Sequence, residues 1–367
     1  MKIIEVTNVD FSLRHFLLPL MRELKARGHE VIGVCADGAL VAEVRGEGVR
    51  VVTLPLARSL SPVAQWRAFW ALYWFFKAEK PDLVHAHMPI SGFLARMAAG
   101  AARVPKIAYT CHGFLFNQPG SLLRRGLSFV LEFVAARVTD VFLTVSQEEA
   151  RDARRLHIFR DALPVLNGRD PAIFHPDAAA RAEIRASLGV AQDRVVFVTV
   201  SRLVRHKGYP ELLAAMRGIA GELWVVGERL ASDHGEDMAP YFEAAAHNGV
   251  VVRSLGYRRD VARILAAADV FVLASHFEGL PMSVIEAMLC GLPVVATAIR
   301  GPREQVREGE TGYLVPPGDS QRLHDALKRL ENDAPRRVSF GEAGLLVATE
   351  KFVEENVITR SVEALGA

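Results

Sequence analysis

Cysteine is scarce in this sequence of 367 residues. Its three cysteines, Cys35, Cys111 and Cys290, lie far apart and form no CxxC pair. This spacing argues against a structural zinc site and against a disulfide framework. We therefore expect a protein of a reducing compartment, the cytoplasm.

A large excess of either charge is also missing. The formal net charge is +2, so nothing in the overall balance requires nucleic acid as a partner. Hydrophobic residues make up 50% of the chain and charged residues 23%, which is typical of a well-packed protein rather than a disordered one. The chain is too long for one ordinary core, which predicts two domains.

No hydrophobic run is long enough to span a bilayer. The first residues, "MKIIEVTNVDF", reach Glu5 and Asp10 before any long apolar stretch, so they predict a buried strand and not a secretory signal. The most apolar segment, "WRAFWALYWFF" at 66–76, has about half the length that a membrane-spanning helix needs. It cannot cross a membrane, but an apolar helix of this length can lie on one.

Two common phosphate-binding motifs are absent as well. Neither half of the chain has GxGxxG after its first strand, where "TNVDFSLRH" and "SRLVRHKG" stand instead, and GxxxxGK[ST] does not occur. These absences argue against a dinucleotide-dependent dehydrogenase and against a nucleoside-triphosphatase of the P-loop type.

Short apolar runs alternate with segments of helical period along almost the whole chain. Such βαβ alternation predicts parallel sheets with helices on both faces. The expected strands are 2–9, 29–36, 49–56, 82–87, 106–112 and 140–146, followed by 194–201, 222–228, 250–256, 269–275 and 293–298. Between the two sets, "NGRDPAIFHPDAAARAEIRASLGVAQD" breaks the rhythm. The sequence therefore predicts an α/β protein with two doubly wound, Rossmann-like domains and a cleft between them.

One stretch combines acidic residues with an apolar setting: "HFEGLPMSVIEAMLCGLPVV", at 276–295. Glu278 is expected in the loop after a parallel strand, where ligands bind in open α/β sheets, and Glu286 about one and a half turns into the next helix. Gly279 allows a close backbone approach, and Pro281 suits the first turn of that helix. The free amides of this turn favour an anion, so we expect a phosphate between the two carboxylates.

A nucleotide sugar has the matching order of parts, which is sugar, diphosphate and ribose. A carboxylate accepts two hydrogen bonds from a vicinal diol, so one acid suits each end of such a ligand. For either glutamate alone the simpler interpretation is preferable, in which Glu286 is a helix acid and Glu278 a solvated loop residue.

A basic loop supports the first interpretation. "SRLVRHKG" places Arg202, Arg205 and Lys207 at the carboxyl edge of the strand at 194–201. Two cations in a strand-to-helix loop can neutralise a diphosphate and stabilise it as it leaves. A basic loop by itself is more often simply solvated.

Taken together, these motifs resemble a known family. "SRLVRHKG", "FEGLPMSVIEAMLCGLPVVAT" and "GETGYLVPPGD" resemble the carboxyl-terminal half of the retaining glycosyltransferases of family 4, including the E-x7-E pattern, and "VHAH", "TCHG", "VSQEEA" and "NGRDPAIFHP" follow the family order before them. The resemblance implies the GT-B fold. We expect an acceptor-side domain at 1–170, a donor domain at 171–349, and a final helix at about 350–367 that packs back onto the first domain.

The resemblance also implies roles for single residues. Arg202 and Lys207 would hold the donor diphosphate, Glu286 the ribose hydroxyls and Glu278 the hydroxyls of the sugar ring. The catalytic set would be Arg202, Lys207 and Glu278 together with His112, which lies in "TCHG".

Other matching positions complete the predicted site. The amides of Gly279 and Leu280 would bind the sugar and the phosphate. His112 is similar to the family histidine that faces the transferred sugar, although a core or strand-end histidine is the default interpretation of the residue alone. Asn167 and Gly168 are interpreted as structural residues at the start of the linker.

The loop after the first strand departs from the family. Many relatives have glycines there, whereas "TNVDFSLRHF" has none. Two interpretations stay open for Asn8, Asp10, Ser12 and Arg14: they line the acceptor side of the cleft, or they cap the following helix.

The resemblance implies retention by a front-face path, in which the leaving phosphate helps to deprotonate the acceptor. No DxD pair is present, and Arg202 and Lys207 supply the charge that a metal would otherwise provide, so we expect no metal and no cofactor. The expected donor is a nucleotide-diphosphate hexose or N-acetylhexosamine, UDP first and GDP second. The expected acceptor is a glycan or a polyprenyl-diphosphate-linked glycan of cell-surface polysaccharide synthesis, with no nucleic acid partner.

The aromatic segment leaves two interpretations open. As a helix it would carry aromatic side chains around much of its circumference and basic ones at its rims: Trp66, Phe69, Trp70, Tyr73, Trp74 and Phe76, with Arg67, Lys77 and Lys80. A core helix is the commoner explanation. The other is a patch that holds the protein at the inner face of the cytoplasmic membrane, and "LLRRGLSFVLEFVAARV" at 122–138 is equally ambiguous.

Three other functions are compatible with the same two-domain fold: a nucleotide-sugar epimerase, a phosphorylase and a non-catalytic scaffold that binds nucleotide sugars. An epimerase would show two acid/base residues around the sugar, and a phosphorylase would need a longer chain and a cofactor lysine. The basic loop paired with E-x7-E fits transfer better than either.

Overall fold

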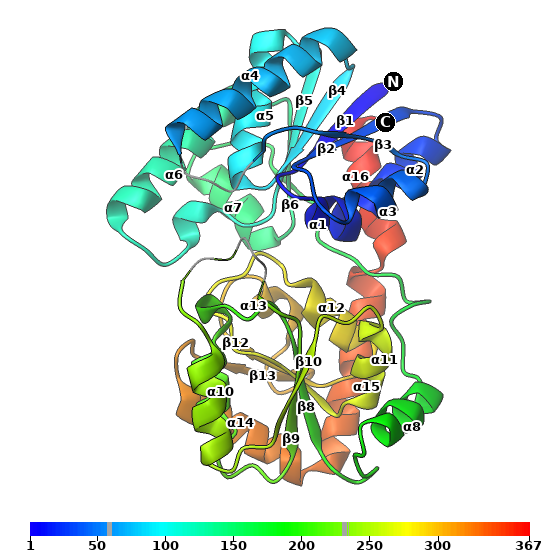
Figure 1. The fold of residues 1–367 in the computed structure, drawn as a ribbon, viewed down its shortest axis with the longest axis vertical. Coiled ribbons are helices and arrows are strands. Elements are labelled where there is room, and N and C mark those ends of the chain that lie inside the picture. The colour runs from blue at the N-terminus through cyan, green and yellow to red at the C-terminus, as the bar shows by residue number, and fades with distance from the viewer. Residues whose placement is uncertain (57–60, 230–232, 234) are drawn as a thin grey trace. The chain divides into compact units, whose positions relative to one another are not determined.

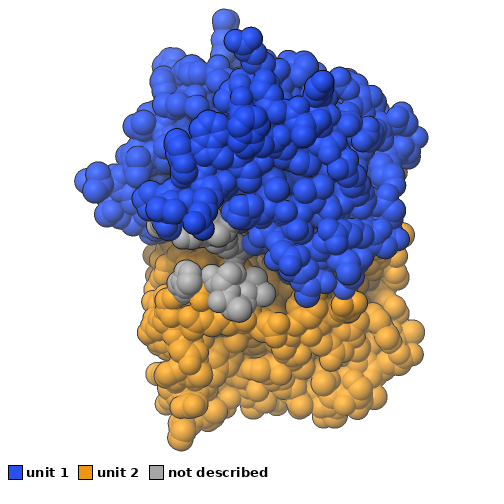
Figure 2. All heavy atoms as spheres, turned by 45° about the horizontal axis from the view of Figure 1, so that its top comes forward, with its two compact units in different colours: residues 1–166, 356–367 blue, residues 167–355 orange. Residues whose placement is uncertain are grey.

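The computed structural model describes residues 1–56, 61–229, 233 and 235–367. The described chain forms two compact units, unit 1 with Met1–Leu166 and Asn356–Ala367 and unit 2 with Asn167–Glu355. Figure 2 shows them in blue and orange.

Unit 1 is built on a 7-stranded sheet with the order β3-β2-β1-β4-β5-β6-β7. All its strand pairs are parallel, which requires a crossover between successive strands. The strands are β1 (Lys2–Val6), β2 (Glu30–Cys35), β3 (Arg50–Thr53), β4 (Leu83–His87), β5 (Lys106–Cys111), β6 (Val141–Thr144) and β7 (Leu163–Pro164).

Helices cover both faces of this sheet. The longer ones are α2 (Leu18–Ala26), α3 (Val41–Gly46), α4 (Pro62–Glu79), α5 (Pro89–Ala102), α6 (Leu122–Ala135), α7 (Gln147–Arg155) and α16 (Glu354–Leu365). Short turns are α1 (Asp10–Ser12), the π-helix η1 (Leu13–Leu17), η2 (Leu115–Asn117) and η3 (Ala136–Val138). Residues of α4 and α5 form the core of one face, and residues of η1, α2, α3 and α16 that of the other (Figure 1).

Unit 2 repeats the plan with a 6-stranded parallel sheet in the order β10-β9-β8-β11-β12-β13. Its strands are β8 (Val196–Val200), β9 (Glu222–Val226), β10 (Val252–Gly256), β11 (Val270–Leu273), β12 (Val294–Thr297) and β13 (Gly312–Val315). Its helices are α8 (Ala178–Ser187), η4 (Arg205–Lys207), α9 (Tyr209–Ala215), α10 (Ala239–His247), α11 (Val261–Ala267), α12 (Met282–Leu289), α13 (Pro302–Gln305), α14 (Ser320–Asn332) and α15 (Ala334–Lys351).

The predicted α/β class with two doubly wound parallel sheets is confirmed. Every predicted strand is present, trimmed by a few residues at its ends. The sequence reasoning did not predict β7 and β13. The first has only two residues and ends in Pro164, and the second lies in a segment, "GETGYLVPPGD", that is dominated by turn residues.

The first residues of unit 2 pack closely against the backbone at the end of the same unit and against the turn before α12. Arg169 forms an isolated parallel bridge with Val353. A Cβ atom on Gly168 would lie 2.8 Å from the Cα atom of Glu354, so only glycine fits there. The Asn167 amide donates a hydrogen bond of 2.7 Å to the carbonyl oxygen of Leu280. These contacts agree with the interpretation of Asn167 and Gly168 as structural.

The aromatic helix α4 has a buried stripe and an exposed one. Ala68, Leu72 and Phe76, four residues apart, are buried in the core of unit 1. Trp66 and Trp74 are each 64% exposed. Each of the two sequence interpretations, core and surface, thus describes one face of the helix. Among the described residues, no helix is both long and apolar enough to cross a membrane.

Candidate active site

In unit 2 the strand order reverses between β8 and β11, and in a doubly wound sheet ligands bind outside the carboxyl ends of the strands at such a point. The loops after these two strands are joined through their backbones. The His276 amide donates to the carbonyl oxygen of His206 at 2.8 Å. Gly208 has φ +74, and a Cβ atom there would lie 2.0 Å from the carbonyl oxygen of Ala274. Glycine is therefore needed to bring the two loops together.

This contact unites two predicted site residues, Lys207 and Glu278. The Lys207 ammonium lies 2.6 Å from Oε1 of Glu278 although the residues are 71 positions apart. The Ser275 hydroxyl donates to the same oxygen at 2.7 Å. Both side chains of the pair are mostly buried, 15% and 11% exposed, so the pair is held in a defined geometry yet reachable from solvent.

The two arginines of the basic loop have different partners. Arg202 pairs with Asp233, whose side chain is only 6% exposed. Arg205 instead forms a bidentate pair with Glu211 on α9, with distances of 2.9 and 3.0 Å. Arg202 and Lys207 therefore each pair with an acid near the carboxyl edge of the sheet, and Arg205 is tied to the helix that follows the loop.

Between them lies a histidine that is neutral at physiological pH. Burial, followed by the neighbouring charges of Lys207 and Arg202, lowers the pKa of His206 to about 4. The positive charge of this loop is thus carried by its arginines and its lysine.

Glu286 lies on α12, as predicted, and its side chain is 9% exposed. Its Oε1 lies 2.6 Å from Nε of Arg169, a residue 117 positions away. The helix begins at Met282 with Pro281 as its N-cap, one residue earlier than the predicted first-turn position. The second carboxylate of the E-x7-E pattern is therefore also paired with a cation.

The turn before α12 is shaped by its neighbours. Gly301 has φ +83, and a Cβ atom there would lie 2.2 Å from the carbonyl oxygen of Gly279. The carbonyl oxygens of Leu280 and Pro281 accept hydrogen bonds from Asn167 and Gln305. Within the described part of the chain, the amides of Gly279 and Leu280 donate no hydrogen bond. These two donors are available to a ligand.

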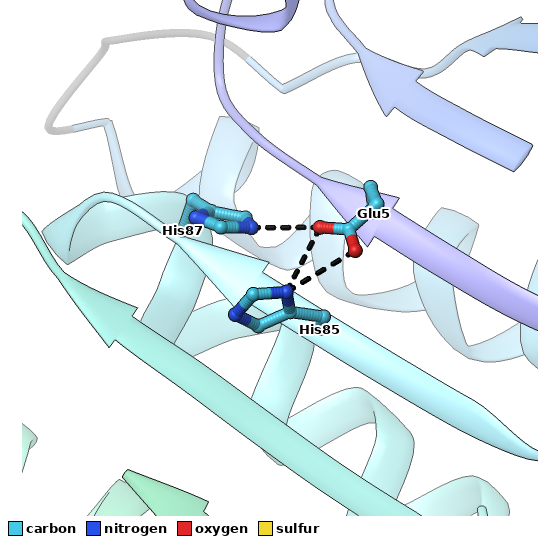
Figure 3. Close-up of side chains that lie close together, drawn as sticks. All are labelled: Glu5, His85 and His87. Atoms are coloured by element: carbon cyan, nitrogen blue, oxygen red, sulfur yellow. Dashed lines mark hydrogen bonds and ion pairs between the residues drawn. The ribbon is translucent and has the colours of Figure 1, made fainter. Parts of the chain in front are cut away.

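Unit 1 has a reversal of strand order between β1 and β4, and a polar cluster lies there (Figure 3). Glu5 on β1 is the register partner of His85 on β4, and His87 follows two residues later on the same face. His85 Nδ1 lies 3.1 and 3.0 Å from the two carboxylate oxygens of Glu5, and His87 Nε2 lies 2.7 Å from Oε2. The other ring nitrogen of His85 lies 2.8 Å from the Thr110 hydroxyl.

His112 extends this cluster toward the surface. It directly follows β5, it is partly exposed, and its Nε2 lies 3.1 Å from Nδ1 of His87. Among the described residues, its Nδ1 has no hydrogen-bond partner. The cluster thus forms a continuous chain from Glu5 through His87 to His112.

Burial and neighbouring charges fix the protonation of this chain. Burial alone would raise the pKa of Glu5, but its two histidine partners, His85 first, lower it to about 2. Burial is the main cause that lowers the pKa of His87 to about 4 and the pKa of His112 well below its usual range. At neutral pH the chain consists of one carboxylate and neutral rings.

The residues predicted for the acceptor side make contacts with the segment around α3. The Asp10 carboxylate accepts hydrogen bonds from the amides of Phe11 and Leu40 at 2.8 and 2.9 Å. Arg14 pairs with Glu43 at 3.4 Å. The N-cap position of α1 is Val9, and no side chain caps it.

The other two predicted residues of this loop differ in burial. Ser12 is buried, 3% exposed, whereas Asn8 is partly exposed. The loop is therefore braced against α3 by Asp10 and Arg14, and in the described chain Oδ1 of Asn8 is buried without a hydrogen-bond partner.

Sequence reasoning missed several members of these clusters: Glu5, His85, His87, Arg169, Asp233 and Ser275. One signal was available in unit 1. An acid in the middle of an apolar strand, "IIEV", faces the alternating histidines of "VHAH" in the neighbouring strand. No comparable signal identified Arg169 and Asp233, because their partners lie far away along the chain.

The chain matches two known protein families. Residues 13–168 match the glycosyl transferase 4-like domain, and residues 180–346 match the glycosyl transferases group 1. Together the two matches cover most of each unit.

Relatives of known activity are similar over most of the chain. The UDP-Gal:alpha-D-GlcNAc-diphosphoundecaprenol alpha-1,3-galactosyltransferase of Escherichia coli is 29% identical over 317 residues, which are 82% of this chain and 79% of that one. The N,N'-diacetylbacillosaminyl-diphospho-undecaprenol alpha-1,3-N-acetylgalactosaminyltransferase of Campylobacter jejuni is 24% identical over 374 residues, 98% and 96% of the two chains.

Among solved structures, HepE from Anabaena in complex with UDP has the same fold. It superposes with a TM-score of 0.82 at 22% sequence identity, and the match covers 100% of both chains.

Proposed function

Because the chain belongs to the GT-B glycosyltransferases, with a glycosyl transferase 4-like domain followed by a group 1 domain, we propose that it transfers a hexose or N-acetylhexosamine from a nucleotide-diphosphate sugar, with retention of configuration, to a lipid-linked glycan. The observation that carries this proposal is a set of three ion pairs near the switch point of unit 2, the place between β8 and β11 where the strand order reverses. The pairs are Lys207–Glu278, Arg202–Asp233 and Arg169–Glu286.

Each pair consists of a cation and a carboxylate that hold each other in place. The cations suit the diphosphate of a nucleotide sugar, and the carboxylates suit its hydroxyl groups. A diphosphate can take over the cations, since charge-assisted hydrogen bonds to phosphate oxygens are strong. When Lys207 turns to the phosphate, Glu278 keeps the Ser275 hydroxyl and gains the capacity to accept hydrogen bonds from sugar hydroxyls. The ligand thus exchanges one set of charge contacts for another.

The remaining donor contacts follow from the same edge of the sheet. The amides of Gly279 and Leu280 bind the sugar and the phosphate, and Glu286, oriented by Arg169, accepts from the ribose hydroxyls. His112 contacts the transferred sugar. The leaving diphosphate is stabilised by Arg202 and Lys207, so the reaction needs no metal, and the departing phosphate assists deprotonation of the acceptor on the same face of the sugar.

The proposed substrates are supported by the names of relatives. The Escherichia coli enzyme uses UDP-Gal and an undecaprenol-diphosphate acceptor, and the Campylobacter jejuni enzyme also acts on an undecaprenol-diphosphate. We take UDP as the nucleotide and a polyprenyl-diphosphate-linked glycan of cell-surface polysaccharide synthesis as the acceptor.

An acceptor of this kind is embedded in a membrane, and unit 1 has a surface that suits one. Both α4 and α6 pack against α5 and lie on the same side of unit 1 (Figure 1). Large apolar side chains are exposed on both helices: Val63, Trp66, Trp70 and Trp74 on α4, and Leu122, Leu123, Leu127, Val130, Leu131 and Val134 on α6. Exposed basic residues, among them Arg67, Lys77 and Arg124, accompany them. We propose that this surface, the α4/α6 face, binds the protein peripherally to anionic membranes.

Donor binding is tested by thermal stabilisation with millimolar UDP-, GDP- and ADP-sugars. A ligand that binds only the folded protein must raise the melting temperature. We expect one donor to stabilise the wild type and to have little effect on Lys207→Ala or Glu286→Ala. Arg205→Ala is the matched control, because it removes a cation of the same loop that is tied to Glu211.

Product analysis tests the reaction itself. We expect a new glycosidic bond with the donor's anomeric configuration, formed only when an acceptor is present and undiminished by excess EDTA. Conversion of the donor without acceptor would identify an epimerase. Binding without turnover on any lipid-linked acceptor would identify a scaffold, and an inverted product would refute the front-face mechanism.

A further inference from the structure

The hydrogen-bond chain from Glu5 to His112 has one direction only. A carboxylate accepts hydrogen bonds and donates none, and Glu5 is ionised at neutral pH because its pKa is about 2. His87 Nε2 lies 2.7 Å from Glu5, so this nitrogen carries the hydrogen of the bond. His87 Nδ1 is then a bare acceptor in the neutral ring.

The same reasoning passes to the next ring. His112 Nε2 lies 3.1 Å from Nδ1 of His87, and two bare nitrogens cannot bond to each other. His112 Nε2 therefore donates. Since burial keeps this ring neutral, its Nδ1 holds a lone pair and no hydrogen.

The neighbouring groups leave this order unchanged. His85 Nδ1 lies within hydrogen-bond distance of both carboxylate oxygens of Glu5, and its Nε2 lies 2.8 Å from the Thr110 hydroxyl, which can rotate to donate or to accept, so this branch imposes no direction on His87. Glu5, His85 and His87 are all buried, at most 2% exposed, so bulk water does not compete for these bonds.

We infer that Glu5 and His87 are positioning residues that hold His112 in the tautomer with a bare Nδ1, so that His112 recognises its ligand as a hydrogen-bond acceptor. The ligand group must then be a donor. A sugar hydroxyl is one and a phosphate oxygen is not, so, resting on the proposed function, His112 reads a hydroxyl of the transferred sugar and takes no part in holding the diphosphate.

Histidine tautomers can be measured directly, without any activity assay. In protein labelled with ¹⁵N-histidine, the ring nitrogen shifts separate protonated from bare nitrogens, and the loss of signals in His112→Asn assigns this ring. We expect His112 to have its hydrogen on Nε2 at pH 7.5. A hydrogen on Nδ1, or on both nitrogens, overturns the inference.

Glu5→Gln tests the origin of the direction. A glutamine amide can accept from His85 and donate to His87 Nε2, which reverses both following bonds and moves the hydrogen of His112 to Nδ1. Thr110→Val is the matched control, since it removes only the end of the His85 branch and should leave His112 as in the wild type. An unchanged His112 tautomer in folded Glu5→Gln refutes the positioning role of Glu5.

A second pair of variants covers the case in which Glu5→Gln does not fold. His87→Asn keeps an acceptor oxygen near the position of Nδ1, whereas His87→Leu keeps none. We expect the Nε2 hydrogen of His112 to persist in the first variant and a mixture of tautomers in the second. A fixed tautomer in His87→Leu overturns the inference.

Kinetics connect the tautomer to the ligand. We expect Glu5→Gln to lower kcat/KM at least tenfold for the full donor, and to lose little further with donor analogues in which one sugar hydroxyl is replaced by fluorine. The wild type should lose activity sharply with one of these analogues. Equal sensitivity of both proteins refutes the hydroxyl contact, whereas absence of all transfer refutes the proposed function and leaves the tautomer measurement to stand alone.

Metal analysis tests the remaining alternative, which is that this cluster binds a metal ion. Glu5, His85 and His87 offer three ligand atoms within 4.8 Å of one another. An ion there would take the place of the hydrogens that fix the direction of the chain. One equivalent of bound metal in the purified protein would therefore overturn the inference, and a metal-free protein with the expected tautomer supports it.

Discussion

The two sheets reverse their strand order in the same way but place different chemistry at that point. In unit 2 the point where the strand order reverses carries three cation–carboxylate pairs whose cations are partly exposed. In unit 1 it carries one carboxylate, Glu5, with the rings of His85 and His87, all buried on the strands themselves. Ion pairs near solvent can exchange partners with a charged ligand, whereas a buried network with no spare donor can only orient what is attached to it. One topology thus supports both an adaptable site and a rigid one.

The largest effect is expected from breaking the adaptable site at Lys207. Lys207→Met keeps much of the side chain's volume but removes the charge, which leaves Glu278 unpaired and the leaving diphosphate less stabilised. We expect kcat to fall by about a thousandfold, the scale seen when one preorganised transition-state donor is lost. Arg205→Met, measured in the same assay, should change kcat less than threefold. Equal losses in the two variants would contradict the assignment.

A smaller effect is expected at Arg169, which orients Glu286 without being a predicted ligand itself. Hydrogen bonds to a charged group contribute roughly 1.5–3 kcal/mol, so Arg169→Met should raise the donor KM by about 10- to 100-fold. Isothermal titration with the donor checks whether binding falls in parallel. An unchanged KM would mean that the helix alone orients Glu286.

The buried cluster of unit 1, which contains Glu5 and His87, should make the stability of the protein depend on pH. The pKa of His87 is lowered from 6.5 to about 4 in the folded state, so between these values the unfolded chain binds a proton that the folded chain does not. Stability contributed by the neutral ring is therefore complete above pH 6.5 and is lost as the pH falls toward 4. Glu5, with its pKa lowered from 4.5 to about 2, loses its contribution at still lower pH.

Hydrogen exchange read separately for the strands of each unit measures this loss. Between pH 7.5 and 5 we expect His87 to contribute a loss of about 2 kcal/mol in unit 1. His87→Asn should abolish that part of the slope. His206 also has a lowered pKa, but it is exposed and solvent screens its charge, so His206→Asn should have a smaller effect, in unit 2. Identical slopes in wild type and His87→Asn would contradict the assigned burial of a neutral ring.

The smallest effect concerns the α4/α6 face. The double variant Trp66→Ser and Trp74→Ser should bind vesicles that contain anionic lipid about five- to tenfold more weakly. Both rings are 64% exposed and can contact the lipid surface. Transfer to a water-soluble acceptor analogue should be unchanged. Leu346→Ser on α15 is the control, because it removes an apolar side chain that is 71% exposed but lies outside the α4/α6 face. Equal binding by all three proteins would refute the face as a membrane site.

The sequence revealed the fold because its strands are short β-branched runs between amphipathic helices, a pattern with few alternative arrangements. It also predicted Lys207 in the loop after β8, Glu278 in the loop after β11 and Glu286 inside the helix that follows. It could not reveal which partner each charge has. Arg169 and Glu286 are 117 residues apart, and a pairing at that distance is determined by tertiary packing.

The aromatic helix shows a different limit. Periodicity cannot divide α4 into a core face and a surface face when apolar rings occupy most positions around it, so Ala68 and Leu72 gave no clearer signal than Trp66 or Trp74. Glu5 shows the opposite case. Its strand was predicted correctly, yet its function as the start of a hydrogen-bond chain depends on a register with β4 that only the assembled sheet defines.

The path of the chain across the junction also has a consequence for biosynthesis. The core of unit 1 includes Val362 and Leu365 of α16, and Lys106 donates to the carbonyl oxygen of Leu365 at 2.7 Å. Unit 2 lies wholly before these residues in the chain, so a ribosome completes it first, although its partner began to emerge earlier. Folding during translation should therefore run against the usual order from the amino terminus. Unit 2 can complete its core before unit 1 does, although the synthesis of unit 1 begins earlier.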